Sequence, residues 1–206
     1  MSKSRKLVQS RKKVNAPTTL RAIARAYTEQ IRPLAEDELN WFRFQPDLGK
    51  TIKFAGLAIN SKGKRYSHQR RIRKGVLPQA EYLLTSNLKA IRQCTSFGEL
   101  FALINSLLNS VDGIGELYIY DTALRIGANL NLLPEKIYLH TGTREGARAL
   151  GFGGKLAYIE VSDLPNGLQE LEPHEIEDVL CIFKDNLKQM KFDLPNQEIR
   201  RRSWCD

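Results

Sequence analysis

Two glycines separated by one apolar residue stand between two stretches of helical pattern, and this spacing suits contact with phosphate. The stretch Val111-Asp-Gly-Ile-Gly115 follows a predicted helix over 97–111 and precedes one over 116–130. One glycine allows a positive φ in a tight turn, and the other lacks a Cβ, so that backbone can approach a phosphate. Ile114 is predicted to point inward and hold the two helices together. The first N–H groups of the second helix, together with its dipole, would then bind a phosphate oxygen without contacting a base.

A second segment with the composition of a phosphate-binding surface covers residues 62–74. It holds seven basic residues in thirteen positions, with aromatic and hydrogen-bonding side chains between them. Such a mixture suits phosphate contact better than solvation alone. Tyr66 or His68 would stack on a base or enter a groove. The candidate DNA-binding residues are therefore Gly113, Ile114, Gly115, Lys62, Lys64, Arg65, Tyr66, His68, Arg70, Arg71, Arg73 and Lys74. The alternative interpretation of 62–74 is a solvated loop that keeps the protein soluble.

The positive charge of the chain is concentrated in its first half. The 206 residues include 32 Lys and Arg against 23 Asp and Glu. Residues 1–100 hold 21 basic and 7 acidic residues, whereas residues 101–206 hold 11 and 16. This asymmetry indicates an anionic partner, which is nucleic acid, an acidic protein or an anionic surface. Residues 1–17 are predicted to be a basic disordered arm, and residues 193–206 a basic mobile tail.

Composition argues against several other classes of protein. No apolar run reaches the roughly 18 residues of a membrane span, and the basic N-terminus lacks the apolar core of a signal peptide. The three cysteines are widely spaced and odd in number, which argues against a disulfide scaffold and a cysteine-rich zinc site. There is no phosphate-binding P-loop and no recognisable nucleophile–base pair. We expect no cofactor, no metal and no membrane contact, and a cytoplasmic location, at the nucleoid if the protein is bacterial.

Apolar periodicity predicts a mainly α fold, with about seven helices and little or no sheet. Residues 18–192 are predicted to form a single helical domain. Ser96 is predicted to cap the helix over 97–111, with Glu99 completing a capping box. Residues 51–60 favour helix over strand, and 156–161 suggest one short extended segment. Other helices are predicted over 18–31, 34–41, 78–92, 143–150 and 173–190, with a loop over 42–50 and a connector over 131–142.

The glycine turn and the residues after it resemble the helix-hairpin-helix motif of the endonuclease III-like DNA glycosylase superfamily. The resemblance runs from Ser96 to Leu150 and includes Ile137-Tyr-Leu-His-Thr141, which is similar to the family's apolar–x–apolar–Asp–Thr pattern. It implies an all-α glycosylase fold and a role in DNA repair. His140 then stands in the place of the family's catalytic Asp, and Leu117 in that of the nucleophilic Lys of bifunctional members. Three cysteines cannot supply the four-cysteine iron–sulfur site of that superfamily.

His140 and Asp121 are the candidate catalytic residues if the protein is an enzyme. An imidazole does not stabilise positive charge on a sugar as a carboxylate does, and a lone His beside a helix start is more often a hydrogen-bonded structural residue. Asp121 is four residues from Arg125, which favours an ion pair on the helix surface. Acidic residues near His174 are expected at a helix N-terminus from the dipole alone, which disfavours a metal site there.

The sequence therefore predicts a protein that binds the DNA sugar-phosphate backbone without base specificity, and it favours a non-catalytic role. The first alternative is a glycosylase- or nuclease-like enzyme that uses His140 or Asp121. The second alternative is an interaction subunit of a larger DNA-acting complex.

Overall fold

The chain folds into a mainly helical structure, as its periodicity predicts. The computed structural model describes residues 17–190, so the predicted arm and tail and residues 191–192 lie outside the described part, apart from Pro17. No helix in this part is long and apolar enough to cross a membrane. Its elements, in order, are α1 Leu20–Gln30, α2 Arg32–Arg43, α3 Leu48–Gly56, η1 Ser67–Gln69, α4 Val76–Ser86, α5 Leu88–Gln93, α6 Phe97–Leu108, α7 Glu116–Leu130, β1 Ile137–Tyr138, α8 Thr141–Ala149, β2 Tyr158–Ile159, η2 Val161–Asp163, α9 Pro173–Ile182 and α10 Lys184–Gln189.

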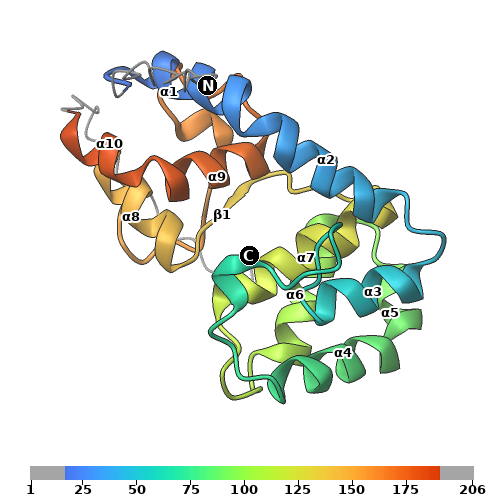
Figure 1. The fold of residues 1–206 in the computed structure, drawn as a ribbon. Helices are drawn as coiled ribbons and strands as arrows, with labels where there is room; N and C mark the ends of the chain where they lie inside the picture. Colours follow the sequence, from blue (N-terminus) through green and yellow to red (C-terminus); the bar gives the residue numbers. More distant parts are fainter. Residues whose placement is uncertain (1–16, 191–206) are drawn as a thin grey trace, which may run out of the picture.

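The buried apolar side chains form two clusters, and the chain passes between them twice. One cluster joins residues of α2 to α7, and the other joins α1 with α8, α9, α10 and the segment around β2. Figure 1 shows α1, α8, α9 and α10 grouped together, α3 to α7 as a second group, and α2 spanning both. The first passage between the clusters is along α2. The second is at strand β1, where Ile137 belongs to one cluster and its neighbour Tyr138 to the other. Successive strand residues point to opposite faces, which explains this division.

Both hairpin helices begin where the sequence predicts, but α6 ends at Leu108, three residues before its predicted end at Val111. The hydroxyl Oγ of Ser96 accepts a hydrogen bond from the Glu99 N–H at 3.2 Å, which confirms the predicted cap of α6. The reciprocal contact of the capping box differs from the prediction, because the Glu99 carboxylate accepts from the N–H and hydroxyl of Thr95 instead. Helix α7 matches its predicted range.

Several predicted boundaries are wrong, and side-chain capping explains two of them. The predicted loop over 42–50 contains the start of α3, because Asp47 caps that helix by accepting from the Lys50 N–H at 2.8 Å. The predicted helix over 78–92 is divided between α4 and α5 at Asn87, whose side-chain amide donates to the Leu83 carbonyl. Such a bond competes with the regular backbone pattern. The predicted helix over 173–190 is divided at Phe183, and nothing in the structure explains this division.

The predicted connector over 131–142 contains a strand and the first turn of a helix. Within the described residues, β1 and β2 form an antiparallel pair with Ile137 opposite Ile159. The extended segment expected over 156–161 is thus confirmed as β2, while its partner was missed because two residues are too few to show alternation. Helix α8 begins at Thr141, two residues before the predicted start.

Candidate nucleic-acid interface

The glycine hairpin presents the start of α7 at the surface. Gly113 has φ +89°, the left-handed conformation that one glycine was predicted to take. Gly115 is the N-cap residue of α7, and a Cβ added to it would meet nothing within 4 Å. Ile114 is half-buried against the core of α2 to α7, as predicted. The N–H groups of a first helical turn have no partner within the helix, so an exposed, side-chain-free N-cap leaves them open to an anion.

The basic segment, residues 62–74, is attached to the hairpin at one end. The Arg73 guanidinium donates to the carboxylate of Asp112, which stands one residue before Gly113. Val76, just beyond the segment, lies 3.6 Å from where a Cβ of Gly113 would be. The other basic side chains of the segment are mostly turned to solvent: Lys62, Lys64, Arg70, Arg71 and Lys74 are exposed, and Arg65 is half-buried. The basic segment and the hairpin are therefore neighbours in space.

Asp121 on α7 binds the side chains of His68 and Gln69 in the middle of the basic segment. Its Oδ2 accepts from the side-chain amide of Gln69 at 2.7 Å and from Arg125 at 3.1 Å, and it lies 2.7 Å from Nε2 of His68. Burial by itself raises the pKa of Asp121, but the charge of Arg125 and the contact with His68 outweigh it, so the pKa is lowered. Asp121 is thus an anchoring carboxylate. The predicted pair with Arg125 is present, but it is buried instead of lying on the helix surface, since Arg125 is 6% exposed.

The two rings of the basic segment have different surroundings. The Tyr66 hydroxyl donates to Glu38, and the Arg125 guanidinium lies 3.8 Å from the centre of the Tyr66 ring. The side chain of His68 is 44% exposed. Of the two residues considered for base stacking, His68 is exposed and Tyr66 is half-buried.

His140 is a buried capping residue. It is the N-cap of α8, where its Nδ1 accepts from the Gly142 N–H at 3.2 Å and Thr143 completes a capping box. Its Nε2 contacts the carboxylate of Glu177, and the residue is 2% exposed. Burial raises the pKa of Glu177 against the opposing effect of His140. His140 therefore holds α8 against α9, which agrees with the structural interpretation of this residue.

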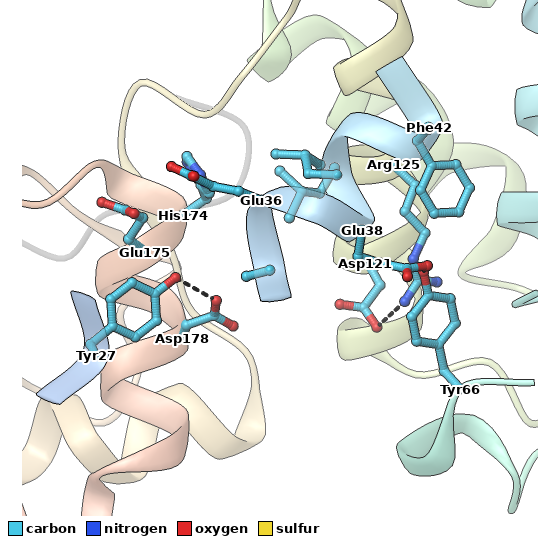
Figure 2. A pocket seen from close by; sticks show the side chains of 13 residues that line it. Tyr27, Glu36, Glu38, Phe42, Tyr66, Asp121, Arg125, His174, Glu175 and Asp178 are labelled. Atoms are coloured by element: carbon cyan, nitrogen blue, oxygen red, sulfur yellow. Dashed lines mark hydrogen bonds and ion pairs between the residues drawn. The ribbon is translucent and has the colours of Figure 1, made fainter. Parts of the chain in front are cut away.

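A cavity between the two clusters brings together residues that the sequence did not single out. It has a volume of about 170 Å³ and lies among α1, α2, α7 and α9, with Tyr66 at its wall. Apolar side chains such as Leu39, Phe42 and Leu124 line part of it. Figure 2 shows the carboxylates that line it, which come from three helices: Glu36, Glu38, Asp121, Glu175 and Asp178.

The carboxylates from α9 lie in unlike surroundings. The Asp178 carboxylate accepts from the Tyr27 hydroxyl at 2.9 Å (Figure 2), and burial followed by the charge of Glu177 raises the pKa of Asp178 to about 7. Glu175 forms a bidentate ion pair with Arg32, at 2.5 and 2.7 Å. Burial by itself raises the pKa of Glu175, but this pair helps to lower it. The acidic residues near His174 are thus held by specific partners, beyond what the helix dipole alone explains. No group of three or more metal-ligating side chains occurs within residues 17–190.

The chain could not be assigned to a family. No family model, curated protein or solved structure matches it.

Proposed function

We propose that this protein binds DNA through the sugar-phosphate backbone, without reading base sequence. The observation that carries the proposal is the attachment of the basic segment to the hairpin through Arg73 and Asp112. The last residues of the basic segment therefore lie beside the turn that precedes the open N–H groups of α7. Backbone amides at a helix start and separate Lys and Arg side chains are the groups that contact DNA phosphates in sequence-independent binding.

The order of elements around the hairpin supports a fold related to that of the DNA glycosylases. Helix α6, the glycine turn and α7 are followed by an apolar strand and by a helix capped at His140, which is the order of the superfamily motif noted above. We propose this kinship for the fold, and with it a cytoplasmic role in DNA maintenance. The buried His140 in place of the catalytic Asp favours binding without base excision.

Salt-dependent binding tests the electrostatic part of the proposal. If about six basic groups contact phosphates, the affinity for duplex DNA is expected to fall with salt along a log–log slope near −5. The double variant Arg70→Gln with Arg71→Gln is expected to make this log–log slope less steep by about 2. The control is Arg21→Gln with Arg25→Gln, which removes two exposed charges from α1. Fluorescence anisotropy over a salt series measures both slopes. A flat salt dependence of the wild-type protein would refute the proposal.

Gly115→Val tests the hairpin. The added side chain meets open space and Gly115 has φ −119°, so the variant is expected to fold. Its branched side chain would cover the amides at the start of α7, and affinity for duplex DNA is expected to fall about tenfold, which corresponds to 1.4 kcal/mol. Circular dichroism checks folding. An unchanged affinity in the folded variant would remove the hairpin from the binding surface.

The cavity supports a second candidate function, a DNA-processing enzyme. Its volume is close to that of a roughly 150 Å³ cavity that holds one benzene ring, so it suits a single ring such as a pyrimidine base turned out of a duplex. Because the pKa of Asp178 is about 7, its carboxyl group can give or take a proton near neutral pH. In this second candidate function the catalytic residue is Asp178 and not His140, because the buried His140 does not line the cavity.

Incubation with duplexes that carry damaged or mismatched pyrimidines tests this candidate. Base release or strand cleavage that Asp178→Asn abolishes, while DNA affinity is retained, would establish it. Asn keeps an oxygen for the Tyr27 hydroxyl, so the variant preserves the local hydrogen bond. The absence of any product from the wild-type protein leaves the non-catalytic proposal in place.

A further inference from the structure

Helix α8, from the other half of the molecule, reaches the start of the hairpin's second helix. The Arg144 guanidinium donates to both carboxylate oxygens of Glu116, at 2.5 and 3.0 Å. Glu116 is the first residue of α7 and follows Gly115 directly. Its carboxylate, with a side chain that is 42% exposed, is therefore close to the open N–H groups that a phosphate would approach. An arginine fork fits a carboxylate and a phosphate equally well.

The cations continue along α8 beyond Arg144. Arg148 is four residues further, on the same helix face, and its Nε donates to the Arg144 carbonyl at 3.2 Å. It lies beside the turn after α8, with its Cδ 3.5 Å from where a Cβ of Gly154 would be. Gly153, Gly154 and Lys155 are exposed in this turn, and a Cβ on Gly153 would meet open space.

The acidic side chains of this region leave Arg148 and Lys155 unneutralised. Glu145, the acid of α8, pairs with Lys184 and Lys188 of α10. Within residues 17–190, neither Arg148 nor Lys155 takes part in an ion pair. Arg148 on α8 and Lys155 in the turn after α8 are therefore unpaired cations. Arg144 is a third cation, and its partner is the carboxylate of the first residue of α7.

We infer that the DNA-contacting surface continues from the hairpin onto α8 and the turn after it, where Arg144, Arg148 and Lys155 bind phosphates, and that Glu116 occupies Arg144 until a phosphate displaces it. This inference rests on the proposed DNA binding and extends it. The basic segment then contacts backbone on one side of the hairpin and α8 on the other, so that bound DNA touches both halves of the molecule. Glu116 lowers the affinity, because a phosphate must compete with its carboxylate for Arg144.

Charge-neutralising variants on either side of the hairpin test this inference. Arg148→Gln with Lys155→Gln is expected to reduce the steepness of the log–log salt slope by about 2. The matched control is again Arg21→Gln with Arg25→Gln. Glu116→Gln removes the competing charge and is expected to raise affinity for duplex DNA three- to tenfold at 100 mM salt. Arg144→Gln in the Glu116→Gln background is expected to cancel this gain.

The two proposals fail separately. If Arg70→Gln with Arg71→Gln reduces the slope but the α8 pair leaves it unchanged, the inference is refuted and DNA binding by the basic segment stands. If neither pair changes the slope, the proposed function fails as well. An unchanged or lower affinity of Glu116→Gln, with thermal unfolding like that of the wild type, refutes the exchange at Arg144.

Discussion

Single residues show how neighbouring charges and hydrogen-bond partners decide which buried groups can exchange a proton. Asp121 and Asp178 are both carboxylates of the cavity wall. Asp121 faces a guanidinium, an amide and an imidazole, and its pKa is lowered. Asp178 has a single hydroxyl donor and a neighbouring carboxylate, Glu177, and its pKa is raised to about 7. Asp121 is therefore a fixed anion with a structural task, and Asp178 is the carboxyl group of the cavity that changes protonation near neutral pH.

Asp178→Asn is expected to stabilise the protein at alkaline pH. The pKa of Asp178 is about 7 in the folded protein and about 3.9 in an unfolded chain. Between these values the native state holds a proton that the unfolded chain has lost, so the carboxyl group costs stability as pH rises, with the full cost above pH 7. We expect the variant to gain on the order of 2 kcal/mol at pH 8 and less at pH 5. Urea unfolding at both pH values measures this difference, and a gain independent of pH would contradict it.

Among the helices, close contact depends on small residues as well as on apolar ones. Helices α8 and α9 meet at Gly146, where an added Cβ would stand 2.1 Å from the carbonyl oxygen of Leu180. No side chain fits this distance, so the two backbones approach as closely as they do because Gly146 has none. The same contact brings His140 on α8 to Glu177 on α9 and positions the arginines of α8 beside the hairpin.

Gly146→Ala is expected to destabilise the protein by about 3 kcal/mol, because the methyl group forces α8 away from α9. Thermal unfolding measures the loss. Gly153→Ala is the control, since its added methyl group meets open space, and it is expected to stay within about 0.5 kcal/mol of the wild type. Equal stability of the two variants would contradict this prediction, because it would show that α8 can move away from α9 without loss of stability.

At the level of the whole molecule, specific polar contacts hold α1 and the start of α2 against α9. Arg32, the first residue of α2, pairs with Glu175 of α9, which is 4% exposed. The hydroxyl of Tyr27, on α1, donates to the carboxylate of Asp178, which is also on α9. The cavity lies between these contacts and those of Glu38 with Tyr66, so its shape depends on how the two halves are held.

Arg32→Gln is expected to lower the free energy of unfolding by about 2–4 kcal/mol, because the buried carboxylate of Glu175 loses its cation. Hydrogen exchange should accelerate in α1, α8 and α9 more than in α3 to α6. Arg73→Gln is the control, since Arg73 and Asp112 are both largely exposed and such a pair contributes at most about 1 kcal/mol. Uniform acceleration along the chain would indicate that the two clusters unfold as one unit.

The sequence alone determined the features that depend on residues close together along the chain. Apolar spacing, Ser96 as a cap and the two glycines predict helices, the start of α6 and the turn between α6 and α7, because these features are set by backbone geometry within a few residues. The asymmetry of charge is equally a property of the sequence. Two further local features were not predicted: Asp47 caps the start of α3, and the Asn87 side chain ends α4.

Only the tertiary structure decided which distant side chains meet. Tyr27 and Asp178 are 151 residues apart, and His140 and Glu177 are 37 apart; no local pattern relates such pairs. The cavity exists because α9, near the end of the described residues, packs against α1. Arg144 reaches Glu116 because β1 carries the chain back across the molecule. Packing of the two apolar clusters brings these groups together, and periodicity shows which residues are buried without showing what each is buried against.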